Sequence, residues 1–145
     1  MDLDEARELL RTQHRAVLAT WRRDGTPQLS PVTVGVDEDG YAVISSRQTA
    51  FKVRNLRRDP RCSLLVESGR KYEDLKGVLI RGRATLEPDT ERVLDLLERV
   101  HEKYNRGPAA GLRDAMRHQA AKRVLIRVRP ERVSSWDHGK LGGAY

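Results

Sequence analysis

The chain is poor in cysteine, in aromatic side chains and in long apolar runs. Cys62 is the only cysteine, so no internal disulfide can form, and its apolar surroundings in the sequence are typical of a buried thiol in a reducing cytosol. No stretch approaches the roughly 18 apolar residues that a membrane-spanning helix needs. The acidic first residues, 1–5, lack the apolar segment of a secretory signal peptide. We therefore expect one cytoplasmic domain with no membrane span.

The common sequence signatures of catalysis are also missing. The chain contains no G-x-G-x-x-G, no Walker loop, no C-x-x-C, no H-E-x-x-H and no G-x-S-x-G. Its four histidines are scattered, and none has the spacing of a metal-ligand pair, so no metal site is expected. These absences disfavour hydrolase and metal chemistry and leave the catalytic residues unknown. A non-metal cofactor that carries its own reactivity fits the sequence better.

Positive charge is what the chain has in excess. Charged residues make up 34% of the sequence, and the formal net charge is +7. Residues 47–61 contain six cations and one aspartate, so this window alone carries 6 − 1 = +5. Such a balance favours an anionic partner. Nucleic acid, an anionic lipid surface and a phosphorylated or polycarboxylate cofactor are all compatible with it.

Hydrophobic periodicity predicts a mainly β, α+β domain with six strands. The turns at Asp24-Gly25 and Asp39-Gly40 indicate that the first three strands form an antiparallel meander. Gly82 interrupts the fifth strand and predicts a bulge or bend. A small Greek-key-like barrel is the natural closure because it leaves no exposed edge, and an open α+β sheet is the alternative. The predicted strands are 16–21, 28–36, 41–45, 61–66, 77–86 and 123–133, with helices starting near residues 3, 88 and 112 and one ending before Pro60. Asp2 with Glu5 gives the first helix a capping-box-like start.

The helix that ends before Pro60 is basic and follows the third strand directly. Backbone amides at its start, with a lysine in the first turn, favour a bound phosphate. The residues near that end are Ser45, Ser46, Arg47 and Lys52. Four arginines follow at i, i+3, i+4 and i+7, a stripe that suits an extended polyanion, namely Arg54, Arg57, Arg58 and Arg61.

A solvated basic helix and a nucleic-acid surface are the alternative interpretations of this segment. Base recognition on a barrel usually employs exposed aromatic side chains, and only seven aromatic residues are present, so nucleic acid is the less favoured partner. A second basic cluster at residues 113–132 shows no pocket-like spacing, and we interpret it as a solvated face.

Three segments carry a resemblance to a known family. They are residues 17–20 (VLAT), 24–32 (DGTPQLSPV) and 52–61 (KVRNLRRDPR). In this order the sequence resembles the pyridoxamine 5'-phosphate oxidase-like split β-barrel superfamily over about residues 10–133, and within it the actinobacterial coenzyme F-420-dependent oxidoreductases. The resemblance implies a six-stranded antiparallel split β-barrel, the FMN-binding split barrel, with flanking helices. It also implies a homodimer whose cofactor sites lie at the subunit interface. The barrel domain would span residues 1–135, with a tail at 136–145.

The resemblance also implies roles for individual residues. Lys52 would contact the cofactor phosphate, with help from Ser45, Ser46 and Arg47. The edge of the tricyclic ring would be lined by Gln28, Ser30, Pro31 and Val32. An acidic cofactor tail would be attracted by Arg54, Arg57 and Arg58.

The function implied is hydride transfer from the reduced deazaflavin, coenzyme F-420, to a small conjugated organic acceptor. The same barrel can hold FMN, and a non-catalytic dimer that binds a flavin or tetrapyrrole is a further alternative. The chain ends in SWDHGKLGGAY at 135–145, without the Arg-Leu-x-Pro type ending of a true pyridoxamine-phosphate oxidase, so vitamin B6 oxidation is not expected. Trp136 could fold the tail over the cofactor cleft, but we expect the last few residues to be disordered.

Overall fold

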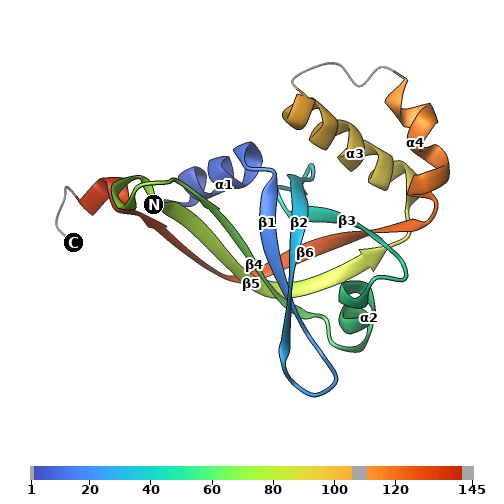
Figure 1. The fold of residues 1–145 in the computed structure, drawn as a ribbon, viewed down its shortest axis with the longest axis horizontal. Coiled ribbons are helices and arrows are strands. Elements are labelled where there is room, and N and C mark those ends of the chain that lie inside the picture. Colours follow the sequence, from blue (N-terminus) through green and yellow to red (C-terminus); the bar gives the residue numbers. More distant parts are fainter. Residues whose placement is uncertain (1, 106–110, 142–145) are drawn as a thin grey trace.

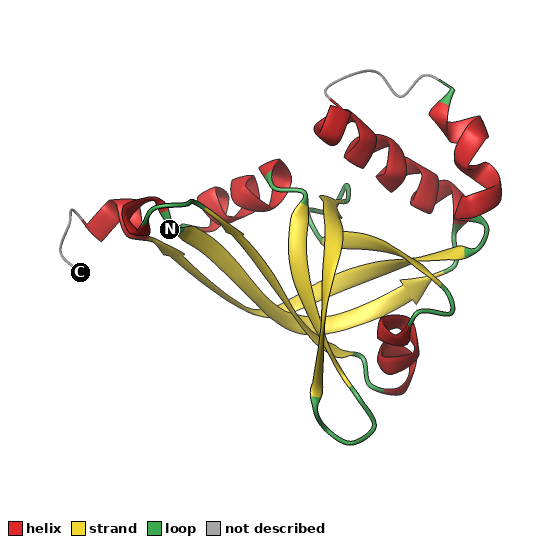
Figure 2. Ribbon diagram, in the orientation of Figure 1, coloured by secondary structure: helices red, strands yellow, loops and turns green. Residues whose placement is uncertain are grey.

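Six antiparallel strands form a closed barrel in the order β1-β2-β3-β6-β5-β4 (Figures 1 and 2). The computed structural model describes residues 2–105 and 111–141. The ring closes because β1 pairs with both β2 and β4. This confirms the predicted six-stranded barrel over the open-sheet alternative. The strands are β1 (Arg15–Trp21), β2 (Pro27–Val36), β3 (Ala42–Arg47), β4 (Arg61–Ser68), β5 (Lys76–Glu87) and β6 (Arg123–Asp137).

Alternating apolar residues of the strands fill the barrel interior. Leu18, Ile44, Leu64 and Ile126 come from four different strands, and each is fully buried. This is the pattern expected where one face of every strand turns inward. Branched aliphatic side chains fill the barrel interior, so the core needs few aromatic residues.

The described helices lie outside the barrel (Figure 2). α1 (Leu3–Thr12) begins with a capping box between Asp2 and Glu5, as its sequence predicts. α2 (Phe51–Arg58) connects β3 to β4. α3 (Thr90–Asn105) and α4 (Leu112–Ala120) pack on the outer face of β3 and β6 around a second apolar cluster that includes Val43 and Leu125. No described helix has both the length and the apolar character needed to cross a membrane.

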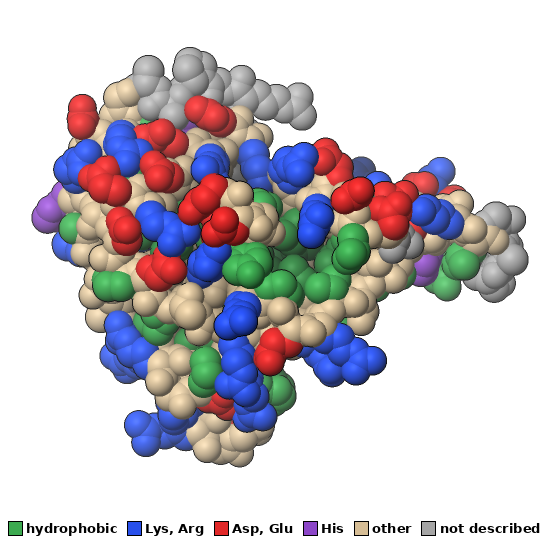
Figure 3. Space-filling model, turned by 180° about the vertical axis from the view of Figure 1, so that it is seen from behind, with side chains coloured by type: hydrophobic (Ala, Val, Ile, Leu, Met, Phe, Trp, Pro, Cys, Tyr) green, Lys and Arg blue, Asp and Glu red, His purple; other side chains and the backbone are tan. Residues whose placement is uncertain are grey.

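The lobe formed by α3 and α4 carries interspersed acidic and basic side chains, visible at the upper left of Figure 3. Arg113 of α4 forms ion pairs with three carboxylates of α3, those of Glu91, Asp95 and Glu98. The solvated face predicted for residues 113–132 is therefore wrong for Arg113, which joins α4 to α3.

The predicted irregularity at Gly82 is confirmed. The register between β5 and β6 shifts between Arg81 and Gly82, so one extra residue is accommodated there. A Cβ atom at Gly82 would lie only 2.0 Å from the carbonyl oxygen of Arg129. Glycine therefore permits the two strands to approach each other at the bulge.

The predicted helix end before Pro60 and the predicted start of the fourth strand at residue 61 are confirmed, but the assignment of Arg61 to the helical stripe of arginines is wrong. α2 ends at Arg58 and Arg61 opens β4, where its guanidinium pairs with Asp59 at 2.7 Å. The predicted end of the sixth strand is also wrong. The sixth strand does not stop at residue 133 but runs to Asp137, pairing with β5 along an arm that extends away from the barrel (Figure 1).

The beginning of the tail is ordered rather than folded over a cleft. Trp136 pairs with Gly77, and its ring occupies the space that a Cβ atom at Gly77 would need. A 3₁₀ helix follows at His138–Leu141, and Lys140 pairs with Glu5 of α1 at 2.7 Å. The expected disorder of the last few residues concerns positions 142–145, which lie outside the described residues.

Candidate functional site

The start of α2 is open to an anion. Its N-cap residue is Ala50, which has no side-chain hydrogen-bond acceptor to offer, and the first turn contains no acidic residue. The amide of Val53 donates to the carbonyl of Ala50, which leaves the amides of Phe51 and Lys52 at the helix end, where the helix dipole places partial positive charge. An external anion is therefore the complementary partner for this helix end.

Three cations converge beside this helix end. They are Arg47 at the end of β3, Lys52 in the first turn of α2, and Arg123 at the start of β6. Burial lowers the pKa of the Lys52 ammonium, and the nearby charge of Arg123 lowers it further. Burial likewise lowers the pKa of Arg123, with a further contribution from Arg47. Within the described part of the chain, none of the three forms an ion pair with a carboxylate.

Two of these cations, Arg47 and Arg123, line a recess of about 640 Å³, which we call the β3–α2 recess, whereas Lys52 is not among its lining residues. Ser45 is connected to it through its hydroxyl, which accepts a hydrogen bond from Nη1 of Arg123 at 3.2 Å. The hydroxyl proton of Ser45 can then be donated to a ligand. Ser46 points to the opposite side of β3, is only 2% exposed, and its hydroxyl donates to the carbonyl of Arg47. The recess is lined by Arg47, Gln48, Thr49, His118, Gln119, Ala121, Lys122 and Arg123.

A second basic depression lies on the other side of α2, between this helix and the β1–β2 turn. We call it the arginine hollow, and its volume is about 810 Å³. Arg54, Arg57, Arg58 and Gln28, all predicted site residues, meet there. The guanidinium of Arg54 also lies 5.7 Å from the ring centre of Phe51, which is 67% exposed. The hollow is lined by Arg22, Arg23, Gln28, Phe51, Arg54, Asn55, Arg57 and Arg58.

The residues predicted to line the ring edge do not share one surface of the protomer. Gln28 lines the arginine hollow, and Val32 is only 7% exposed inside the barrel. Ser30, on the same face of β2, is half-buried. Pro31 lies on the outer face, opposite Val17, where it borders a separate depression of about 170 Å³. Within a single chain, Pro31 is therefore separated from the other three by the thickness of the strand.

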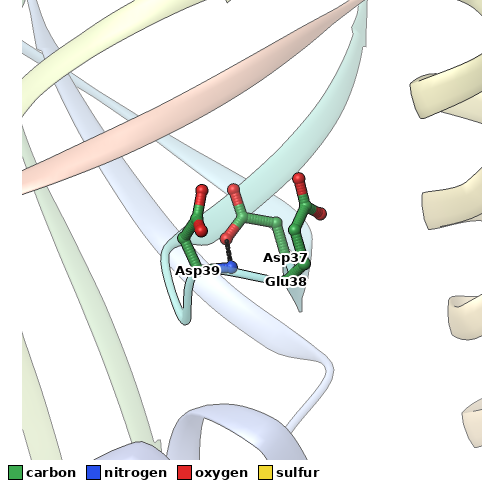
Figure 4. Close-up of side chains that lie close together, drawn as sticks. All are labelled: Asp37, Glu38 and Asp39. Atoms are coloured by element: carbon green, nitrogen blue, oxygen red, sulfur yellow. Dashed lines mark hydrogen bonds between the residues drawn. The ribbon is translucent and has the colours of Figure 1, made fainter.

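Three carboxylates gather at the β2–β3 turn (Figure 4), namely Asp37, Glu38 and Asp39. Asp37 is engaged by protein groups, since its Oδ2 accepts a hydrogen bond from Nε of Arg127 at 2.6 Å and its Oδ1 accepts from the backbone amides of Asp39 and Tyr41. Arg92 adds a second cation at 3.4 Å. The cluster therefore ties the turn to β6 and α3. Arg127, predicted to be on a solvated face, is a member of this network.

Sequence reasoning missed two parts of the basic surroundings of α2. Arg123 lies opposite Arg47 in the β3–β6 register, but the two are far apart in the sequence. Arg22 and Arg23 belong to a turn, where exposed arginines are common. The alternation of residues 124–128 predicted the strand that carries Arg123, and the order of the strands in the barrel is what brings it to the recess.

Comparison with known proteins gives the family context. Residues 3–137 match the sequence profile described as pyridoxamine 5'-phosphate oxidase. The conserved hypothetical protein Rv2991 from Mycobacterium tuberculosis is 34% identical, with a TM-score of 0.89, and the match covers 98% of this chain and 88% of that one.

Two more distant structures share the fold. An F-420 reductase is 23% identical with a TM-score of 0.67, and the match covers 88% of this chain and 94% of that one. A heme-binding protein from Mycobacterium smegmatis is 20% identical with a TM-score of 0.66, over 92% of this chain and 57% of that one. At these identities the similarity shows the fold alone.

Proposed function

Because this chain belongs to the pyridoxamine 5'-phosphate oxidase family, we propose that it binds coenzyme F-420 through the basic surroundings of α2 and acts as a deazaflavin-dependent reductase. The resemblance of three sequence segments to coenzyme F-420-dependent oxidoreductases supports this choice of cofactor. The observation that carries the proposal is the group of three cations, Arg47, Lys52 and Arg123, that converge without a carboxylate partner in the described chain. Mutual repulsion and partial burial make such a group costly unless an anion binds.

The donors at the β3–α2 recess fit a phosphate monoester or diester. Arg123 supplies charge from the lining of the recess, and the hydroxyl of Ser45, which it contacts, supplies a neutral donor. Lys52, close to Arg123, and the start of α2 add positive charge beside the recess. Arg47 lines the same recess. Their task is to bind and orient the cofactor, since the group itself supplies the hydride chemistry when bound.

The arginine hollow favours the deazaflavin over FMN. Coenzyme F-420 carries an acidic tail beyond its phosphate, whereas FMN ends at the phosphate. Arg57 links the two basic regions, because it lines the hollow while its Nη1 donates to the carbonyl of Gln48 in the recess at 3.3 Å. A ligand with its phosphate in the recess and its tail in the hollow would use all the predicted arginines. The F-420 reductase among the structural neighbours is consistent with this choice.

The proposal includes a homodimer. On the outer face one row of apolar residues crosses four strands, from Pro31 of β2 through Val17 of β1 and Leu65 of β4 to Leu79 of β5. In the next row Leu29 pairs with Ala19, and Ser63 of β4 ends the apolar surface. Leu29 is 66% exposed in the protomer. Burial of this surface against a second copy would remove apolar area from water. It would also bring Pro31, which faces outward, to a boundary between subunits where the cofactor ring can contact it.

Titration with F-420 and with FMN, each at two salt concentrations, tests the binding proposal. We expect tighter binding of F-420 and a larger loss of its affinity at high salt, because tail contacts are exposed and screened. Lys52→Ala and Arg123→Gln should weaken binding of both cofactors, whereas Arg132→Ala on the distant β6 arm should change neither. Equal affinity of the Lys52→Ala variant and the unmodified protein would contradict the phosphate assignment.

Turnover tests the enzymatic part. Reduced F-420 bound to the protein should be reoxidised when a small conjugated ketone is added, and the acceptor should be recovered with its double bond reduced. The reaction would balance, because the acceptor gains one hydride and one proton and the reduced cofactor would give up one hydride to the acceptor and one proton to solvent. Binding without turnover over a broad range of acceptors would instead indicate a cofactor carrier.

A further inference from the structure

A buried amide joins α2 to the β1–β2 hairpin. Asn55 is 6% exposed and faces the barrel. Its Nδ2 donates to Oγ1 of Thr20 at 3.1 Å and to Oε1 of Gln28 at 3.0 Å. Its Oδ1 accepts from Nη2 of Arg58 at 3.2 Å. The side chains of Thr20, Gln28 and Arg58 therefore supply all three hydrogen-bond partners of this amide.

The direction of this hydrogen-bond chain is set by Arg58. A guanidinium has only donors, so the atom of Asn55 that faces it must be the oxygen. Arg58 is itself held in place, since its Nη2 also donates to the carbonyl oxygen of Trp21. Both hydrogens of the Asn55 amide then point toward Thr20 and Gln28. Gln28 must present its oxygen to Asn55, which leaves the Nε2 hydrogens of Gln28 available to the arginine hollow that it lines.

The hollow consequently offers donors to a ligand. Its five arginines form no ion pair with a carboxylate among residues 2–105 and 111–141. Arginines elsewhere in the fold that lie near acids are paired, as Arg92, Arg113 and Arg127 are. Asn55 also lines the hollow, but both hydrogens of its amide are already donated to Thr20 and Gln28.

We infer that Asn55 is a positioning residue that makes Gln28 a hydrogen-bond donor, so that the arginine hollow selects a chain of several anionic acceptors. The ligand class is an oligocarboxylate or an oligophosphate. The inference rests on the proposed function in one respect only, the identity of coenzyme F-420 as the molecule whose acidic tail occupies the hollow. The selectivity itself follows from the contacts of Asn55.

Two substitutions reverse or remove the donor with little change of shape. Asn55→Asp turns the donor facing Gln28 into an acceptor, so Gln28 should rotate and present its oxygen to the hollow, and it also adds a negative charge at the wall beside Arg58. Gln28→Glu keeps the oxygen that Asn55 needs but removes the donor and adds negative charge. Thr20→Val is the matched control, because it removes the other contact of the Asn55 amide and leaves the direction of Gln28 unchanged.

The probes are tri-glutamate and inorganic tripolyphosphate, measured by titration calorimetry at low salt, with spermine as the cationic control. We expect at least one of the two anions, and not spermine, to bind the unmodified protein. Both Asn55→Asp and Gln28→Glu should weaken that binding about 10- to 100-fold, the range for a lost hydrogen bond to a charged group. Thr20→Val should lower the melting temperature with little change in affinity. Tighter binding of tri-glutamate would indicate a carboxylate chain, and tighter binding of tripolyphosphate a phosphate chain.

Side-chain amide signals in a proton–nitrogen correlation spectrum give a readout that loss of stability alone would not produce. The Gln28 amide signals should shift on addition of the anion, and Asn55→Asp should move them even without ligand. If neither anion binds, or if Thr20→Val weakens binding as much as Asn55→Asp, the inference is overturned. A protein that binds the anion as expected but binds neither F-420 nor FMN would retain this inference and lose the proposed function.

Discussion

Asp37 and Arg127 form a partly buried ion pair that holds the β2–β3 turn against β6. The Asp37 side chain is 4% exposed, and its Oδ2 lies 2.6 Å from Nε of Arg127. The same guanidinium lies 4.2 Å from the ring centre of Tyr41, so one arginine engages a carboxylate and an aromatic face together. The pair accounts for the position of Arg127, and it makes the turn a fixed part of the barrel.

We expect Asp37→Asn to destabilise the fold by about 1.5–3 kcal/mol at neutral pH, the range for hydrogen bonds to charged groups. The substitution removes the charge that Arg127 faces and leaves the volume nearly unchanged. Denaturant unfolding measures the change. Glu38→Gln is the control, since Glu38 is exposed and 3.6 Å from Arg92, and it should cost much less.

The difference in stability between the unmodified protein and Asp37→Asn should change with pH in one direction. Burial raises the pKa of Asp37, but the Arg127 guanidinium and the amides of Tyr41 and Asp39 outweigh burial and hold the pKa below its ordinary value. A lowered folded-state pKa adds stability above the unfolded-state pKa and loses it as the pH falls through the folded-state pKa. The stability gap between the unmodified protein and Asp37→Asn should therefore be largest at neutral pH and shrink in acid. A gap that widened in acid would contradict the assignment.

The β-bulge gives a prediction from sterics alone. A side chain at Gly82 would meet the backbone of β6, because its Cβ would lie 2.0 Å from the carbonyl oxygen of Arg129. A backbone atom cannot rotate away, so Gly82→Ala should force the strands apart and cost about 1–3 kcal/mol. Unfolding measurements test this, with Arg81→Ala, an exposed neighbour on the same strand, as the control. Unchanged stability of Gly82→Ala would show that the strands can separate there freely.

The success of the sequence-based predictions depended on how local the signal was. Gly82, the Asp2–Glu5 capping box and the helix before Pro60 each have a signature within a few residues, and each prediction is confirmed. Arg61 was assigned to the helical stripe because it follows Arg54 by seven residues. That count crosses Pro60, and the helix has already ended at Arg58, with Asp59 as its C-cap. Arg123 could not have been found this way, because its proximity to Arg47 comes from the pairing of β3 with β6.

The proposed dimer predicts different outcomes for two leucines of equal exposure. Leu29 on the outer strand face is 66% exposed and Leu3 on α1 is 65% exposed. Leu29→Arg should convert a dimer to a monomer in light scattering, because a charge would be buried between the subunits. Leu3→Arg should leave the oligomeric state unchanged. A monomeric unmodified protein, or equal effects of both substitutions, would contradict the choice of this face.

Cys62 should react only when the protein opens. Its side chain lies in the core, 4% exposed. Burial, with a smaller effect of the charge of Glu131, raises the pKa of the thiol from 9.0 to about 11. Because the thiolate is the reactive form, modification by a disulfide reagent at pH 8 should be slow in the native protein. It should become fast and complete in urea. Rapid modification without denaturant would show frequent local opening near β4.

Anions should stabilise the protein through the β3–α2 recess, and Arg123 should control the effect. Phosphate or pyrophosphate binding to the folded state adds stability, about 2.7 kcal/mol at a hundredfold excess over Kd, which corresponds to roughly 8 °C in Tm for a chain of this size. Arg123→Gln should reduce that gain. In anion-free buffer the same variant should be at least as stable as the unmodified protein, because it relieves repulsion between Lys52 and its neighbour.

The pH dependence of the anion effect follows from Lys52. Its pKa is lowered by burial and by Arg123, so the folded state releases this proton more readily than the unfolded chain does. Without an anion, stability should therefore increase as the pH rises through the folded-state pKa of Lys52. A bound anion raises that pKa again, so anion affinity should fall over the same range, and Lys52→Met should abolish this part of the pH dependence. Thermal melts in matched phosphate and chloride buffers measure both trends. An identical response to phosphate in the unmodified, Arg123→Gln and Lys52→Met proteins would place the anion elsewhere.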